Sequence, residues 1–205
     1  MELSAAVHRR RMVRSFAADP VAPATVDHLV DLARRAPSAG NTQAWRFVVL
    51  EGADTGRLWE ATLGDPARRA AFRWQGLLAA PVLVLPLVRP DAYVDRYAEG
   101  DKAATGLGAG RSAWPVPYWW VDVGMVVHGL LLGAVDAGLG ALFYGLFDHE
   151  EAALAALGVP DGWRAPGVVA LGRPAGDDVP GRSAGRPRPP LGEVLHRGGW
   201  RDADR

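Results

Sequence analysis

Three observations predict an α+β fold in which helices flank a central sheet. First, short apolar runs resemble strands, at residues 45–50, 81–88, 141–147 and 167–172, although the third run is also consistent with a turn. Second, the segments between them show helical periodicity without the regular βαβ alternation that a doubly wound parallel sheet needs. Third, a chain of 205 residues, 49% of them hydrophobic, suits one domain with a substantial core, so we treat residues 1–205 as a single domain.

The N-terminal part of the chain is expected to contain mainly helices. Residues 3–11 can form a short helix with arginines at its C-terminal end. Apolar residues at helical spacing predict a second helix over residues 24–35, and Pro37 ends it. After the strand at residues 45–50, two further helices are expected, over residues 54–63 and 66–79.

The middle of the chain changes from a clear strand to an irregular segment. Residues 81–88 are almost continuously apolar, as in a strand that is covered on both faces. Residues 89–120 are irregular and rich in glycine, proline and tryptophan, and a long segment of this kind is often a lid or a binding loop. We interpret this segment as a lid or substrate wall formed with Trp114, Tyr118 and Trp119. Packing of the same aromatic side chains in the core is the alternative.

Residues 121–138 are apolar on almost every side and predict a helix buried in the core or in a dimer interface. Asp122 lies where its charge favours the positive end of a helix dipole. A membrane span is the alternative, but the charges of Asp122 and Asp136, together with His128, argue against it. Asp148 is expected to cap a further helix that continues to about residue 157.

The C-terminal tail, residues 173–205, is rich in proline and has little core of its own. Its apolar side chains are therefore expected to lie on the same domain or on a partner subunit. These side chains are Leu191, Val194, Leu195 and Trp200.

Composition excludes several classes of function. The formal net charge is zero, so the chain as a whole does not attract nucleic acid or an anionic membrane. Without cysteine, disulfides, thiolate catalysis and cysteine-bound metals are excluded, and the five histidines show no HxxxH or HExxH spacing, so we expect no metal site. Residues 1–4 do not begin a signal-peptide pattern, and we expect a cytoplasmic protein.

Arginines are concentrated near both ends of the chain. Arg10, Arg11 and Arg14 lie within five positions, and Arg186 and Arg188 lie on a Pro-rich stretch. A guanidinium group is permanently charged, and its rigid fork of donors matches phosphate oxygens. Taken separately, the first group is also consistent with a solvated basic surface, and the second with a solvated tail or a polyproline ligand segment.

A polar turn leads into the strand at residues 45–50. Ser38, Asn41 and Gln43 offer hydroxyl and amide groups that suit the carbonyls and ring nitrogens of a flat heteroaromatic ligand. An ordinary helix C-cap and turn is the alternative. The glycines at 138, 140 and 145 bracket an apolar strand, but GxGxxG, a Walker lysine and GxSxG are absent, so classical dinucleotide, P-loop and hydrolase sites are not indicated.

In this order, the motifs resemble the nitroreductase family of FMN-dependent oxidoreductases. Residues 10–16 (RRMVRSF) are similar to the family's Arg-Arg-Ser-x-Arg-x-Phe, and residues 36–45 (APSAGNTQAW) to its Ala-Pro-Ser-x-x-Asn-x-Gln-Pro-Trp. The Gly-Leu-Gly, Leu-Gly-x-Pro and basic Arg-x-Pro-Leu segments of the family have counterparts at 138–140, 171–174 and 186–191. The resemblance covers nearly the whole chain, and residues 10–50 are its specific part.

The resemblance implies a mostly antiparallel sheet and an intertwined homodimer that exchanges its C-terminal tails and holds two FMN molecules at the interface. Arg10, Arg11 and Arg14 would contact the phosphate and the pyrimidine edge of FMN, and Arg186 and Arg188 would complete the phosphate clamp. Met12 lies within the same motif, where the family usually has serine, so one hydroxyl contact is lost.

The other cofactor contacts that the resemblance implies come from two further segments. Pro37, Ser38 and Asn41, together with Gln43 of the same motif, would approach the flavin from the other subunit. Tyr144 and Gly145 would present backbone N–H groups near the flavin N5 atom. Some members of the family have an acidic residue in place of Tyr144, so this position bears on the choice of substrate.

The implied activity is a ping-pong cycle in which NAD(P)H reduces FMN and leaves before a small electron-poor acceptor, such as a nitroaromatic, quinone or enone, is reduced. The cofactor performs the redox chemistry, so no catalytic side chain is assigned. Alternatives are a specialised flavin enzyme of the same fold (a biosynthetic dehydrogenase, a dehalogenase or a flavin-fragmenting enzyme), a non-catalytic flavin-binding protein, and a scaffold that binds no flavin.

Overall fold

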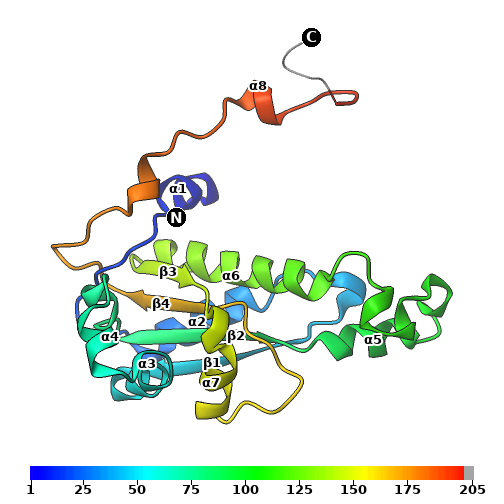
Figure 1. Ribbon diagram of the computed structural model, residues 1–205. Coiled ribbons are helices and arrows are strands. Elements are labelled where there is room, and N and C mark those ends of the chain that lie inside the picture. Colours follow the sequence, from blue (N-terminus) through cyan, green and yellow to red (C-terminus); the bar gives the residue numbers. More distant parts are fainter. Residues whose placement is uncertain (201–205) are drawn as a thin grey trace.

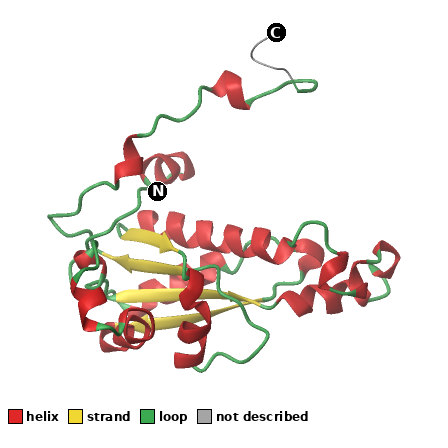
Figure 2. Ribbon diagram, viewed as in Figure 1, coloured by secondary structure: helices red, strands yellow, loops and turns green. Residues whose placement is uncertain are grey.

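The computed structural model describes residues 1–200, and its centre is one four-stranded sheet (Figures 1 and 2). The strands are β1 (Trp45–Glu51), β2 (Val82–Val88), β3 (Gly140–Tyr144) and β4 (Val168–Gly172). Their order across the sheet is β1-β2-β4-β3, and all three neighbouring pairs are antiparallel. The α+β class and the antiparallel sheet are therefore confirmed.

Helices account for most of the remaining regular structure of residues 1–200. They are α1 (Leu3–Arg9), α2 (Pro23–Ala33), α3 (Thr55–Leu63), α4 (Pro66–Ala70), α5 (Pro90–Ala98), α6 (Tyr118–Asp136), α7 (Glu150–Ala156) and α8 (Leu191–Val194). Two expectations were wrong in detail. The helix expected over 66–79 ends at Ala70 and is followed by a short 3₁₀ turn, and Asp148 lies in the turn before α7 instead of capping it.

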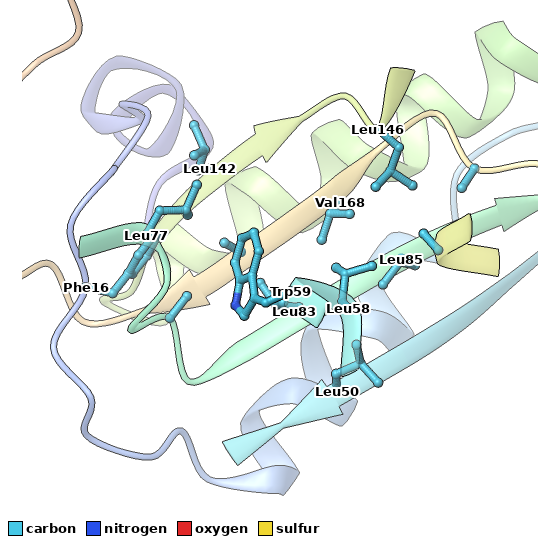
Figure 3. Close-up of a cluster of buried hydrophobic side chains, with 14 of the residues drawn as sticks. Phe16, Leu50, Leu58, Trp59, Leu77, Leu83, Leu85, Leu142, Leu146 and Val168 are labelled. Carbon is cyan, nitrogen blue, oxygen red and sulfur yellow. The ribbon is translucent and has the colours of Figure 1, made fainter. Parts of the chain in front are cut away.

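The core lies on both faces of the sheet, because successive side chains of a strand point to opposite sides. Leu83 and Leu85 of β2 pack on one face with Trp59 of α3 (Figure 3). Val82 and Val84 pack on the other face with residues of α2 and α6. The β2 strand is buried along its whole length, as its uninterrupted apolar run predicts.

Helix α6 covers the face of the sheet that carries Val82 and Val84. It is long and apolar enough to cross a membrane by length and composition alone, but half of its apolar window is buried inside the protein. It packs on α2 and on the sheet, with Leu130 and Val126 fully buried. We therefore describe α6 as a core helix, one face of which remains exposed.

The segment 89–120 is more ordered than its sequence pattern indicates. It begins with α5 and continues through three 3₁₀ turns. Trp114 and Trp119 are only 7% and 8% exposed, because they pack edge-on against the buried ring of Tyr93. For these two tryptophans the burial favours the core-packing alternative, whereas Tyr118 is exposed, and the substrate wall stays a prediction.

The C-terminal tail extends away from the rest of the molecule (Figure 1). Its apolar residues Leu191, Val194, Leu195 and Trp200 are all exposed. The expectation that they lie on their own domain is wrong for the described chain, and their contact with a partner subunit stays a prediction.

Candidate functional site

Arginines from both ends of the chain line one cavity of about 400 Å³. Five arginines contribute to it, together with neighbouring residues of the N-terminal segment and of the tail. The lining residues are Arg10, Arg11, Met12, Arg14, Pro180, Gly181, Ser183, Ala184, Arg186 and Arg188. We call this space the arginine cavity. It brings together, within a single subunit, all the arginines that the sequence singled out.

Short backbone contacts position the two walls of the arginine cavity. The N-terminal wall follows the edge of β3, where the N–H of Val13 donates to the carbonyl of Ala141 at 3.0 Å. The tail begins directly after β4 and runs beside the same segment, because the N–H of Ala175 donates to the carbonyl of Ser15 at 3.0 Å. The buried side chains of Val13 and Phe16 anchor this segment to the core.

Asp178 joins the two walls. Its side chain is 1% exposed and forms an ion pair with the guanidinium of Arg11. Its Oδ1 also accepts hydrogen bonds from the backbone N–H of Arg14 at 2.7 Å and of Ser15 at 3.0 Å. Burial alone raises the pKa of a carboxyl group, but these three donors outweigh it and hold the pKa of Asp178 below its usual value.

The remaining charge of the arginine cavity is positive. Arg14 donates to the carbonyl of Met12 at 3.2 Å and lies over the ring of Trp74 at 5.2 Å, which fixes its position. Among residues 1–200, no carboxylate lies within 4.0 Å of the guanidinium groups of Arg10, Arg186 or Arg188. Permanent charges without a carboxylate partner, gathered around a concave space, suit a phosphate group.

The polar turn forms a separate hydrogen-bonded unit. Gly40, Asn41 and Gln43 all have positive φ angles, of 60°, 53° and 50°. The Ser38 hydroxyl accepts from the backbone N–H of Gln43 at 2.9 Å, and the Asn41 carbonyl oxygen accepts from the Gln43 amide at 2.8 Å. Within residues 1–200, the Ser38 hydroxyl proton, the Asn41 amide protons and the Gln43 side-chain carbonyl oxygen have no hydrogen-bond partner.

This turn does not line the arginine cavity of its own subunit. None of Pro37, Ser38, Asn41 and Gln43 is among the lining residues, and Pro37, Asn41 and Gln43 are exposed at the surface. The polar turn and the arginine cavity are therefore separate features of one subunit. The sequence-based expectation of a shared site remains a prediction.

Tyr144 and Gly145 lie at the end of β3 and also outside the arginine cavity. The Tyr144 ring stacks on Trp59, with ring centroids 5.9 Å apart, and burial raises its pKa. Its hydroxyl is buried without a hydrogen-bond partner among the described residues. The side chain of Tyr144 packs against the core, and its expected contact with substrate stays a prediction.

Two buried carboxylates were not recognised as site residues from the sequence. Asp178 binds residues 164 and 163 positions away, and Asp122 accepts from the N–H of Ala39, 83 positions away. No spacing rule links such positions. No group of three or more histidine, aspartate or glutamate side chains in the described part of the chain is placed to hold a metal ion.

Comparison with known proteins identifies the family. The family model described as "Nitroreductase family" matches residues 7–173. The chain is 31% identical over 199 residues to an NADH dehydrogenase of Thermus thermophilus, covering 88% of this chain and 90% of that protein. It is 32% identical over 187 residues to a 5,6-dimethylbenzimidazole synthase of Rhodospirillum rubrum, covering 84% of this chain and 82% of that protein.

Solved structures show the same fold. An FMN- and NADPH-dependent nitroreductase, NfnB, from Sphigopyxis sp. strain HMH superposes with a TM-score of 0.71 and 22% identity, covering 98% of this chain and 100% of that one. A nitroreductase-like protein from Bacillus cereus superposes with a TM-score of 0.70 and 18% identity, covering 96% and 95%. From the family model and the curated relatives, we conclude that the chain belongs to the nitroreductase family of oxidoreductases.

Proposed function

We propose that this protein is an FMN-dependent oxidoreductase that uses NAD(P)H to reduce a small electron-poor acceptor, such as a nitroaromatic, a quinone or an enone, by a ping-pong mechanism. The observation that carries the proposal is the arginine cavity, in which five guanidinium groups from the two ends of the chain surround about 400 Å³. Membership of the nitroreductase family supports it, as does the likeness to an NADH dehydrogenase.

The arginine cavity is the proposed binding site of the FMN phosphate. Arg10, Arg186 and Arg188 supply the charge, because no carboxylate in residues 1–200 neutralises them. Arg11 is balanced by Asp178, and we assign it mainly to holding the two walls together. Arg14 is fixed over Trp74 and faces the cavity. Bound FMN supplies the hydride and electron transfer itself, so the chain needs only to bind and orient it.

The polar turn is the proposed contact for the flavin ring. The uracil-like edge of an isoalloxazine ring has two carbonyl oxygens on either side of one N–H. The free donors of Ser38 and Asn41 and the free acceptor of Gln43 are complementary to these groups. We propose that Pro37 and this turn come from the second subunit, and that the backbone N–H groups of Tyr144 and Gly145 lie near the flavin N5 atom.

A homodimer is the second part of the proposal, and exposed apolar side chains support it. Val121 and Met125 of α6 are 45% and 37% exposed, and Leu3 and Val7 of α1 are also exposed. The tail extends away from the rest of the molecule (Figure 1), and its apolar residues are exposed. We propose that a second copy covers these apolar surfaces and exchanges its tail. In that assembly, we infer a soluble, cytoplasmic protein.

The first test is the absorbance spectrum of freshly purified protein, which should show a flavin bound in stoichiometric amount or one that can be reconstituted with FMN. Oxidation of NADH and NADPH is then followed against a panel of nitroaromatics, quinones and enones. A yellow protein that turns over no acceptor would be a non-catalytic flavin binder. A colourless protein that cannot be reconstituted would rule out flavin chemistry altogether.

A specialised flavin reaction is the second candidate, because two 5,6-dimethylbenzimidazole synthases are 32% and 28% identical to this chain over most of its length. The reaction product distinguishes this specialised reaction from that of a general reductase. Protein incubated with reduced FMN in air is analysed by mass spectrometry for 5,6-dimethylbenzimidazole. Formation of this compound, with no reduction of the acceptor panel, would replace the reductase assignment.

A further inference from the structure

A buried carboxylate of α6 holds the polar turn from inside the protein. Asp122 is 1% exposed, and its Oδ2 accepts hydrogen bonds from the backbone N–H of Ala39 at 2.8 Å and from the hydroxyl of Tyr93 at 2.9 Å. A charged group is buried only where hydrogen bonds offset its desolvation. The bond from the Ala39 N–H connects Asp122 directly to the polar turn, which we call the 38–43 loop from here on.

Helix α5 holds the same loop from a second side. The Arg96 Nε donates to the carbonyl of Gly40 at 2.9 Å, and the ring of Tyr97 lies against the Gly40 Cα. A Cβ added at Gly40 would come within 2.8 Å of that ring, and the φ of +60° favours glycine there. The Tyr93 hydroxyl belongs to the same helix, so α5 and Asp122 act on the loop together.

These contacts decide which groups of the loop face outward. The N–H of Ala39 is directed to Asp122 and is not available to a ligand. The Asn41 and Gln43 side chains are exposed and bonded to one another, with Ser38 bonded to the Gln43 backbone. Asn41 and Gln43 are non-glycine residues with positive φ, a strained conformation that persists only where the surrounding structure supports it. The support comes from the segment 89–120 and from α6.

We propose that Asp122, with Tyr93, is a positioning residue for the ring of the cofactor. It fixes the 38–43 loop so that Ser38, Asn41 and Gln43 present their free polar groups together. The segment 89–120 then acts as the scaffold behind the loop, through α5. This inference rests on the proposed function, because it assigns the loop to the flavin ring and the arginine cavity to the phosphate.

The test compares two ligands that differ only in the phosphate, FMN and riboflavin, by titration of the flavin-free full-length protein. Asp122→Asn keeps the shape of the side chain but removes its charge. It should weaken the binding of both ligands by a similar factor, about tenfold, because the hydrogen bonds that position the loop lose their charged acceptor. Arg186→Ala should weaken the binding of FMN and leave riboflavin unchanged. Asp31→Asn, at an exposed ion pair of α2, is the matched control and should bind both ligands as the wild type does.

Hydrogen–deuterium exchange gives a second readout that needs no flavin. The Ala39 amide should exchange faster in Asp122→Asn, with unchanged exchange in residues 10–14. If Asp122→Asn does not fold, Tyr93→Phe, which removes one hydroxyl, takes its place in both experiments. It should lower the affinities for FMN and riboflavin, and speed exchange of the Ala39 amide, by smaller amounts.

Unchanged affinity of the folded variant for both ligands, or a loss for FMN alone, overturns the positioning role of Asp122. The failure of the proposed function has a different signature, since the wild-type protein would then bind neither ligand. Equal losses for FMN and riboflavin together with faster exchange at Ala39 support the inference.

Discussion

The carboxylate of Asp178 is bound to the guanidinium of Arg11, 167 residues earlier in the chain. The same carboxylate accepts the backbone N–H groups of Arg14 and Ser15. One side chain thus ties the start of the tail to the N-terminal segment. Backbone pairing near Ser15 and Phe16, and a hydrogen bond from the Ser15 hydroxyl to Asp177, are further contacts between the two walls of the arginine cavity.

Asp178→Asn should lower the free energy of unfolding by about 2 kcal/mol, since it weakens hydrogen bonds to a buried charge. Chemical denaturation measures the change. Asp177→Asn is the matched control, because Asp177 is the exposed neighbour and accepts only from the Ser15 hydroxyl. We expect the control to change stability by less than about 0.5 kcal/mol. Equal effects of the two variants would contradict the role given to Asp178.

The contribution of Asp178 should depend on pH. Its pKa in the folded protein lies below the ordinary value, because the donors from Arg11, Arg14 and Ser15 outweigh the effect of burial. The ionised carboxylate therefore stabilises the fold fully above the unfolded pKa of about 4, and this stabilisation declines as the pH falls toward the folded pKa. The stability difference between wild type and Asp178→Asn, measured in urea, should be constant from pH 7 to 5 and shrink below pH 4. A difference that is already lost at pH 6 would point to another group.

The fold followed from the sequence wherever burial was uniform along an element. The apolar run of β2 and the all-round apolar pattern of α6 identified both elements within a few residues. The segment 89–120 was misread because α5 is short and polar on its outer face, although Pro90 at its first turn is a regular start signal. Trp114 and Trp119 were interpreted as a substrate wall because the sequence does not show that both rings pack against Tyr93 and against each other.

Some residues of the candidate site could likewise be recognised from the sequence, and others could not. Both arginine groups were recognised, because guanidinium clusters and phosphate binding are linked by residue type alone. Asp178 and Asp122 were not recognised as site residues, because each acts through contacts with residues more than 80 positions away in the sequence. Only folding brings such residues together. The direction of the Tyr144 ring was also hidden, since alternation along β3 did not reveal that Trp59 stacks on it.

The arginine cavity predicts a selective loss of phosphate binding. Arg10→Ala should weaken the binding of FMN by at least about tenfold, the value of one charge-assisted hydrogen bond, and leave riboflavin unchanged. Arg9→Ala is the matched control, because Arg9 is the exposed preceding residue and does not line the arginine cavity. Both are measured by flavin fluorescence titration. If Arg9→Ala and Arg10→Ala lower the affinity for FMN equally, general surface charge explains the binding.

The entry to β4 depends on a glycine. Gly167 has a φ of +155°, and a Cβ there would lie 2.2 Å from the carbonyl oxygen of Tyr144. Gly167→Ala should therefore destabilise the protein by at least about 2 kcal/mol through backbone strain and the clash with β3. Gly56→Ala is the opposite case, since Gly56 lies within α3 with open space around it, and should stabilise by about 0.5–1 kcal/mol. Melting temperatures of the two variants, moving in opposite directions, check this.

The exposed face of α6 predicts how the protein assembles. Met125 lies on this face and is 37% exposed, near Val121. In a symmetric dimer, Met125→Asp places one charge from each subunit into the apolar interface, so the dissociation constant should rise by about 100-fold or more. Val49→Asp, a similarly exposed apolar position on β1, is the control and should stay dimeric. Light scattering after gel filtration measures the mass of both.

Because we place the 38–43 loop of one subunit against the arginine cavity of the other, the Met125→Asp monomer should also lose its affinity for FMN. A folded monomer that retains FMN as tightly as the wild type would show that each subunit holds the cofactor alone.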